Sequence, residues 1–184
     1  MIEQIQRCEK CGLCFNQRPL LDSQRSCQVI WVGLSAKKKT LEVETPLSPH
    51  TSSGLLIKKI EEKCSDVVTY KTNLVKCLPL SERETLRYPT KKEIDCCFEN
   101  LLCEIHTLSP QIVFLLGEKV SSSVAQHFHI QFDKWHDFDY RFMNISGIYY
   151  VPVHHPSYIN VYRRKMVEQY ILSIAQLMDK LLNC

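Results

Sequence analysis

Short apolar segments alternate along the sequence with segments of helical periodicity, and this alternation restricts the possible folds more than any other feature. Four apolar segments have the composition of buried strands, the second being long enough for one strand or two: 28–34, 66–77, 111–117 and 147–153. Apolar residues recur at helical spacing in four further segments: 52–64, 90–108, 118–128 and the tail from 161. Strands that alternate with helices predict a parallel sheet covered on both faces. We therefore expect a three-layer α/β/α fold with a central, mainly parallel sheet of four strands.

Length and composition indicate one globular domain over residues 1–184, with a cysteine-rich N-terminal segment. The chain is 45% hydrophobic and 23% charged, which is typical of such domains. No apolar run approaches the roughly 18 residues of a membrane helix, and the opening MIEQIQRCEK is too polar for a signal peptide. We expect a cytoplasmic monomer that does not bind a membrane. The net charge of +3 is only a weak indication of an anionic partner.

Four loops follow the expected strand ends, and ligand sites in open parallel sheets lie beyond the carboxyl ends of the strands. These loops begin after Gly33, Cys77, Gly117 and Val153. The first of them, 35–53, is long for a compact domain, and loops of that length are usually functional or disordered. We expect the four loops to converge on one site.

The chain contains ten cysteines, too many to be core residues alone in a compartment that keeps thiols reduced. Cys8, Cys11 and Cys14 lie in CEKCGLC, where a C-x-x-C turn lets two thiolates reach one metal centre. Cys77, beside a strand end, and Cys96 or its neighbour, at a helix start, are candidates for the remaining ligands. The spacing alone leaves both a zinc site and an iron–sulfur cluster open.

Several motifs now occur in one order along the chain: CEKCGLC, VIWVGLS, PLSPHTSSGLL, TNLVKCLP, PTKKEIDCC, QIVFLLG and HHPSY. Taken together, the sequence resembles the iron–sulfur uracil-DNA glycosylases, families 4 and 5 of that superfamily. The resemblance extends from Cys8 to about Tyr158. Its most specific parts are the T-N-x-V-K-C-x-P, P-T-x-x-E-I-x-x-C and H-P-S strings. It implies a uracil-DNA glycosylase-like version of the fold expected above.

The resemblance also implies a set of metal ligands. The family binds its cluster through two cysteines of the first C-x-x-C, one of the K-C-x-P string and one of the E-I-x-x-C string. In this sequence those positions are Cys8, Cys11, Cys77 and Cys97. The resemblance therefore favours a structural [4Fe–4S] cluster, with zinc as the alternative.

Two polar residues match the residues with which the family binds and releases a base. Asn73 matches the base-reading asparagine, whose amide offers one acceptor and two donors to a pyrimidine edge. His155 matches the histidine that donates to the base oxygen and stabilises the departing anion. The adjacent His154 is the less favoured candidate. A capping asparagine and a surface histidine are the structural alternatives.

The segment after the first strand departs from the family pattern. Family 4 carries G-E-x-P-G there, whereas this chain has GLSAKKK, with Leu34 in place of the catalytic acid. Family 5 has G-L-A-P, which Leu34 and Ser35 approach, and we expect both residues to bind substrate. Leu47 occupies the place of the aromatic residue that stacks on the base. This smaller side chain leaves room for a bulkier or modified pyrimidine.

A catalytic carboxylate is absent from both family positions. The aspartate of family 5 falls roughly on His50, which we expect to act in catalysis together with His155. Glu42 and Glu44 are alternatives in the same loop. Two further possibilities are an enzyme that relies mainly on leaving-group stabilisation and an enzyme with a changed substrate.

Basic residues near the expected site are candidates for phosphate contacts. The DNA-binding candidates are Lys37, Lys38, Arg163 and Arg164, with Lys39, Lys165, Arg83 and Arg87 as further cations nearby. In the family, the region after H-P-S wedges into the DNA groove. The residues available to fill the space of a flipped base are Tyr158, Ile159 and Tyr162.

The sequence therefore predicts a monofunctional DNA glycosylase that flips a damaged or modified base, uracil or a related pyrimidine, out of single- or double-stranded DNA and hydrolyses its N-glycosidic bond. The main alternative is a catalytically weak or inactive iron–sulfur nucleic-acid-binding protein of the same fold. A third possibility is a small zinc-binding protein unrelated to glycosylases.

Overall fold

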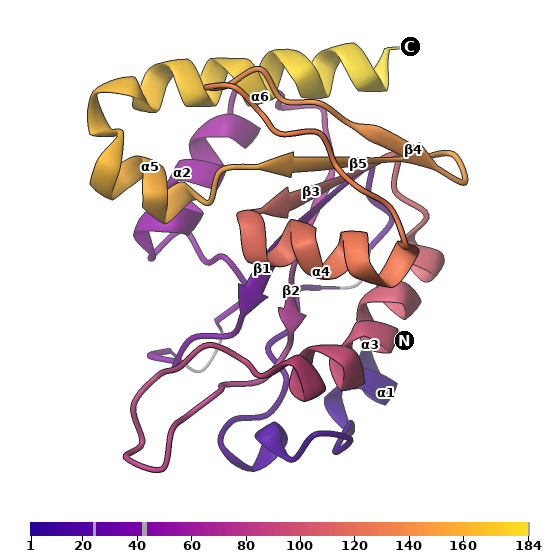
Figure 1. Cartoon of the computed structure of the whole chain (residues 1–184), viewed down its shortest axis with the longest axis vertical. Coiled ribbons are helices and arrows are strands. Elements are labelled where there is room, and N and C mark those ends of the chain that lie inside the picture. Colours follow the sequence, from indigo (N-terminus) through magenta and orange to yellow (C-terminus); the bar gives the residue numbers. More distant parts are fainter. Residues whose placement is uncertain (24, 42–43, 184) are drawn as a thin grey trace.

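A computed structural model of the chain describes residues 1–23, 25–41 and 44–183. Five strands form one sheet in the order β2-β1-β3-β5-β4 (Figure 1). The four expected strands are all present and run parallel: β1 Val29–Ser35, β2 Thr69–Val75, β3 Ile112–Leu116 and β5 Ile148–Val153. The expected number of strands is wrong by one, because β4, Met143–Ile145, pairs antiparallel with β5. This strand has three residues, too few for an alternating pattern.

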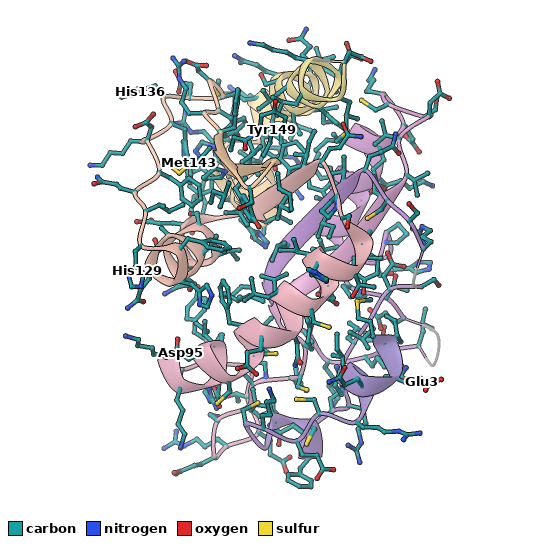
Figure 2. All side chains as sticks on the ribbon, turned by 90° about the vertical axis from the view of Figure 1, so that its right-hand side faces the viewer. Glu3, Asp95, His129, His136, Met143 and Tyr149 are labelled. Carbon is teal, nitrogen blue, oxygen red and sulfur yellow. The ribbon has the colours of Figure 1, made fainter. Side chains whose placement is uncertain are left out.

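Helices cover both faces of the sheet. One face carries α2 (Ser52–Glu61), α5 (Pro156–Tyr162) and α6 (Val167–Leu182). The other face carries α3 (Lys91–Leu108) and α4 (Glu118–Phe128), seen from their side in Figure 2, where Asp95 marks an early turn of α3. The chain also forms the short helix α1 (Ile2–Gln6) and two 3₁₀ turns, η1 (Leu13–Phe15) and η2 (Arg164–Met166).

Alternate residues of β1 belong to two separate hydrophobic cores. Val29 and Trp31 pack with α2 and α6, whereas Ile30 and Val32 pack with α3 and α4. Both sets are fully buried because successive side chains of a strand point to opposite faces. The continuous apolar run in the sequence thus reflects a strand that is covered on both faces.

The helix boundaries follow local signals in most places. Thr90 and Glu93 form the capping box that their spacing predicts, with each side chain accepting from the other residue's backbone N–H. Thr51 caps α2 by accepting from the N–H of Gly54 at 3.0 Å. The tail is not one continuous helix, because the chain turns at Arg163 and lets both α5 and α6 contact α2. No helix in the described residues is long and apolar enough to cross a membrane.

Candidate active site

A cavity of about 330 Å³ opens beyond the carboxyl ends of β1 and β2. Three of the four expected loops contribute to its wall. Eight of the candidate residues named from the sequence line it: Leu34, Ser35, Lys37, Glu44, Leu47, Asn73, Arg87 and His155. The fourth loop contacts one of them, since a β-carbon on Gly117 would lie 3.1 Å from the β-carbon of His155.

Asn73 is buried in the wall of the cavity, where β2 pairs with β1. Its register partner is Gly33, and a β-carbon on Gly33 would lie 2.4 Å from Asn73 Oδ1 and 3.5 Å from Leu47 Cδ2. Only a residue without a side chain therefore leaves space for the amide in this position. Asn73 and Leu47 both approach the same point above Gly33.

A buried ion pair that the sequence analysis did not detect supports Asn73 from behind. Lys76 Nζ donates to the backbone carbonyl of Asn73 at 2.6 Å and to Glu104 Oε2 at 2.6 Å. Tyr70 and Thr72 donate to the same carboxylate, at 3.0 Å from Tyr70 and 2.9 Å from Thr72. Both charged side chains are almost completely buried, so each depends on the other for its stability inside the protein. The end of β2 is thereby fixed to α3.

His155 caps the N-terminus of α5 and faces the cavity as a neutral ring. Its Nδ1 accepts from the backbone N–H of Ser157 at 3.1 Å and lies 2.7 Å from Ser157 Oγ. Since Nδ1 accepts from an N–H, the ring carries its proton on Nε2. Burial, with a smaller contribution from the nearby Lys37 cation, lowers the pKa of His155 to about 4. At neutral pH the ring is therefore an uncharged hydrogen-bond donor.

The neighbouring His154 belongs to a different environment. Trp135 Nε1 donates to its Nε2 at 2.9 Å, and Tyr140 Oη lies 2.8 Å from its Nδ1. Tyr158 stacks on its ring with centroids 5.4 Å apart. These contacts give His154 a structural role in packing the loop before α5.

Of the two loop candidates for catalysis, Glu44 lines the cavity and His50 does not. His50 is exposed and is not among the residues that line the cavity. Glu44 lines it, and is the one carboxylate among the described lining residues. Its Oε2 accepts from the N–H of Thr40 at 2.8 Å, and this bond is the main reason that its pKa is lowered. The other candidate acid, Glu42, lies outside the described residues.

The four predicted metal ligands, Cys8, Cys11, Cys77 and Cys97, gather at one end of the molecule, although they come from three separate segments. Their thiols are free of disulfides, and the pKa of Cys77 is raised to about 12, mainly by burial and then by its closeness to Cys97 and Cys11. Asn100 Nδ2 donates to the sulfur of Cys8 at 3.5 Å and to that of Cys97 at 3.7 Å. Within the described ranges, no three His, Cys, Asp or Glu side chains are placed to hold a single metal ion.

This donor set fits an iron–sulfur cluster chemically. Thiolates are its usual ligands, and N–H donors to their sulfurs are among the features that tune such clusters. The backbone N–H of Lys76 adds another donor, 3.4 Å from the sulfur of Cys97. A cationic metal centre would reverse the electrostatic cost of bringing these thiolates together. Cys14 is buried in the same apolar cluster.

The predicted DNA-binding cations are exposed. Lys37 and Lys38 follow β1, and Arg163 and Arg164 lie in the turn between α5 and α6. Among the proposed wedge residues, Ile159 is fully buried and cannot enter DNA, whereas Tyr162 is 73% exposed. Arg87 is committed elsewhere, because its two terminal nitrogens donate to Glu93 at 2.8 and 2.6 Å.

Comparison with known proteins identifies the family. Residues 11–178 match the family model described as the uracil DNA glycosylase superfamily. The chain belongs to the uracil DNA glycosylase superfamily. This confirms the superfamily that the sequence motifs indicate, whereas membership of its iron–sulfur families stays a prediction.

A solved structure supports the same superfamily fold. The crystal structure of wild-type Pedobacter heparinus SMUG2 matches with a TM-score of 0.56 and 14% identity, covering 87% of this chain and 78% of that one. No curated protein matches the sequence significantly. The mostly parallel sheet and its flanking helices are therefore a uracil-DNA-glycosylase-like arrangement.

Proposed function

We propose that the protein is a monofunctional DNA glycosylase that binds a flipped, damaged or modified pyrimidine and hydrolyses its N-glycosidic bond. The observation that carries this proposal is that Asn73 and the neutral ring of His155 line one cavity in a chain of this superfamily. A base in a duplex is inaccessible to chemistry, so such enzymes extrude it into a pocket and read its Watson–Crick edge.

Asn73 suits recognition of the base edge, and His155 suits stabilisation of the base as it leaves. The Asn73 amide pairs with a base edge that presents both donors and acceptors. Bond cleavage places negative charge on the departing base, and a preorganised donor in a partly buried site stabilises that charge. His155 Nε2–H is such a donor, and its low pKa keeps the ring from binding a proton that would disturb its bond with Ser157.

The cleavage also places positive charge on the sugar. Glu44 is ionised at neutral pH and lies in the cavity wall, so we assign it the task of stabilising that charge or orienting the attacking water. The exposed position of His50 argues against the catalytic role expected from the sequence. Leu47 provides an aliphatic wall beside Asn73, which accommodates a pyrimidine with an added substituent.

We further propose that Cys8, Cys11, Cys77 and Cys97 hold a [4Fe–4S] cluster, with zinc as the alternative. When bound, the cluster supplies a cross-link between the N-terminal segment, the end of β2 and α3. The chain's own contribution is the set of N–H donors from Asn100 and Lys76. No step of the reaction passes through these residues.

DNA is the partner that this surface suits. The cations Lys37, Lys38, Arg163 and Arg164 are exposed, and Lys37 lines the cavity, so we assign them the phosphate contacts. Tyr162 is the most exposed of the wedge candidates, so we assign it the task of filling the space of a flipped base. One copy of the chain supplies all these groups, which agrees with action as a monomer.

An excision assay tests the proposal. Purified protein is incubated with single- and double-stranded oligonucleotides that contain uracil, hypoxanthine, xanthine or modified cytosines, and released base is measured. We expect excision of at least one pyrimidine, and loss of excision with retained DNA binding in His155→Ala and Asn73→Ala. His50→Ala is the matched control and should behave as wild type. DNA binding without excision of any base would instead support the non-catalytic alternative.

A further inference from the structure

Two exposed apolar side chains overhang the cavity from the loop between Cys77 and α3. Leu86 is 55% exposed and Tyr88 is 68% exposed, yet both belong to the cavity lining. Exposed apolar groups at the rim of a pocket mark a surface that a ligand covers. In Figure 1 this loop is the long segment that leads into the first turn of α3.

The loop is held in place by bonds that do not involve the exposed side chains. The guanidinium of Arg87 donates twice to Glu93 and, through Nε, to the carbonyl of Leu80 at 2.9 Å. A further bridge joins Leu80 to Leu86 across the loop. Because Glu93 also closes the capping box of α3, the loop is fixed to the first turn of that helix. The backbone of Tyr88, next to Arg87, is therefore held in a fixed position at the cavity.

The ring of Tyr88 has one occupied face and one open face. Lys119 Nζ lies 4.4 Å from the ring centroid, a cation–π contact from the first turn of α4. A ring that is 68% exposed in spite of this contact leaves most of its other face uncovered. Lys119 lies two residues after Gly117, which contacts His155. The open ring is thus at the same rim as the proposed leaving-group donor.

Leu47 gives the cavity an apolar wall but no aromatic face. Flipped bases are held by aromatic or apolar faces, and an aliphatic side chain offers no π-face. Among the described residues of the lining, the only aromatic rings are those of Tyr88 and His155. His155 is engaged by Ser157 and is assigned to the leaving group.

We propose that Tyr88 is a further base-binding residue, whose open ring face stacks against the flipped pyrimidine. This inference rests on the glycosylase function proposed above. The aromatic surface comes from the loop before α3, while Leu47 is the wall beside Asn73. Stacking does not depend on base identity, so Tyr88 contributes affinity and orientation while Asn73 reads the edge.

Three variants test the inference. Tyr88→Leu removes the π-face but keeps an apolar side chain, Tyr88→Phe keeps the ring, and Glu82→Ala is a control at an exposed position of the same loop outside the cavity lining. We expect Tyr88→Leu to lower kcat/KM about 5- to 100-fold, the range for loss of one base-stacking ring. Tyr88→Phe and Glu82→Ala should stay within about threefold of wild type. Thermal unfolding should be unchanged in Tyr88→Leu, which separates stacking from a structural role.

A fluorescent cytosine analogue, pyrrolo-cytosine, placed at the target position reports stacking directly, because stacking quenches it. We expect quenching with wild type and Tyr88→Phe, and weaker quenching with Tyr88→Leu. Excision and quenching by Tyr88→Leu equal to those of wild type would overturn the inference. It would also be overturned if Tyr88 affected quenching only when the analogue occupies a position next to the target base. If wild type excises a base and His155→Ala does not, either of these outcomes would rule out the role of Tyr88 and leave the proposed glycosylase function standing. If wild type excises nothing, the proposed function fails and the inference with it.

Discussion

Gly33 and Asn73 are register partners on neighbouring parallel strands, and the Asn73 amide occupies the space in which a Gly33 side chain would lie. Gly33→Ala should therefore push the amide out of its position while leaving both strands paired. Misplacement by about 1 Å can cost on the order of 100-fold in rate, so we expect a loss of at least about 10-fold in single-turnover excision. Circular dichroism should show an intact fold. A fully active Gly33→Ala variant would contradict the assignment of Asn73.

The buried pair of Lys76 and Glu104 should behave as a single unit in unfolding experiments. Removing one partner leaves an uncompensated buried charge, so Lys76→Met should lower the free energy of unfolding by roughly 3–5 kcal/mol. In the double variant Lys76→Met/Glu104→Leu, no charge is left behind. We expect its loss to be clearly smaller than the sum of the two single losses. Urea titrations of all four proteins measure the coupling, and strict additivity would argue against the pair.

The depressed pKa of His155 predicts a pH dependence of stability. The pKa of His155 is about 4 in the folded protein, against about 6.5 in an unfolded chain. Between these values the unfolded state binds more protons, so stability falls as the pH drops from 6.5 towards 4. The full loss amounts to about 3 kcal/mol.

A matched pair of variants isolates this contribution. His155→Gln should lose part of the decrease in unfolding free energy between pH 7 and pH 4.5, whereas the exposed His50→Gln should keep it. Excision by the wild type should change little above pH 5 and decline near pH 4, where the ring gains its second proton. Identical pH profiles for the two variants would show that His155 is not the group responsible.

Adjacent cysteines on α3 allow a test of the metal ligands. Cys97 is buried among Cys77 and Cys14, whereas Cys96 is only partly buried and lies outside that apolar cluster. Cys97→Ser should therefore yield protein with little iron and without the broad visible absorption of a cluster, and Cys96→Ser should retain both. Metal analysis of the purified variants gives the answer. Stoichiometric zinc in a colourless wild type would replace the iron–sulfur proposal.

Local patterns were sufficient for much of the fold. The bounds of α4 and the capping box of α3 follow from helical spacing and from the pair Thr90 and Glu93. The strand β4 was missed because it has three residues and gains its order from pairing with β5. The turn at Arg163 was also missed, since neither proline nor glycine marks it and it depends on how α5 and α6 meet α2.

The residues of the site likewise fall into those that a local motif predicts and those that it does not. Asn73 and His155 lie in motifs, and the structure brings both to one cavity. Lys76 and Glu104 lie on different elements, and Tyr88 contacts Lys119 from another segment, so no local pattern predicts these contacts. His50 was expected to act in catalysis because the aspartate of family 5 falls roughly on its position. In the structure His50 is exposed, and it lies three residues after Leu47, whose backbone is left-handed.

Lys76 contacts both the residue proposed to read the base and one of the proposed metal ligands. Its side chain holds the Asn73 carbonyl, and its backbone N–H donates to the sulfur of Cys97. A displacement of α3 would therefore be transmitted to the backbone of Asn73 and to Cys97 together. A redesign of base selectivity that leaves the cysteines undisturbed would first require replacement of Lys76 and Glu104. Substitutions at the Asn73 end of the cavity and at the cysteine site are therefore expected to affect each other.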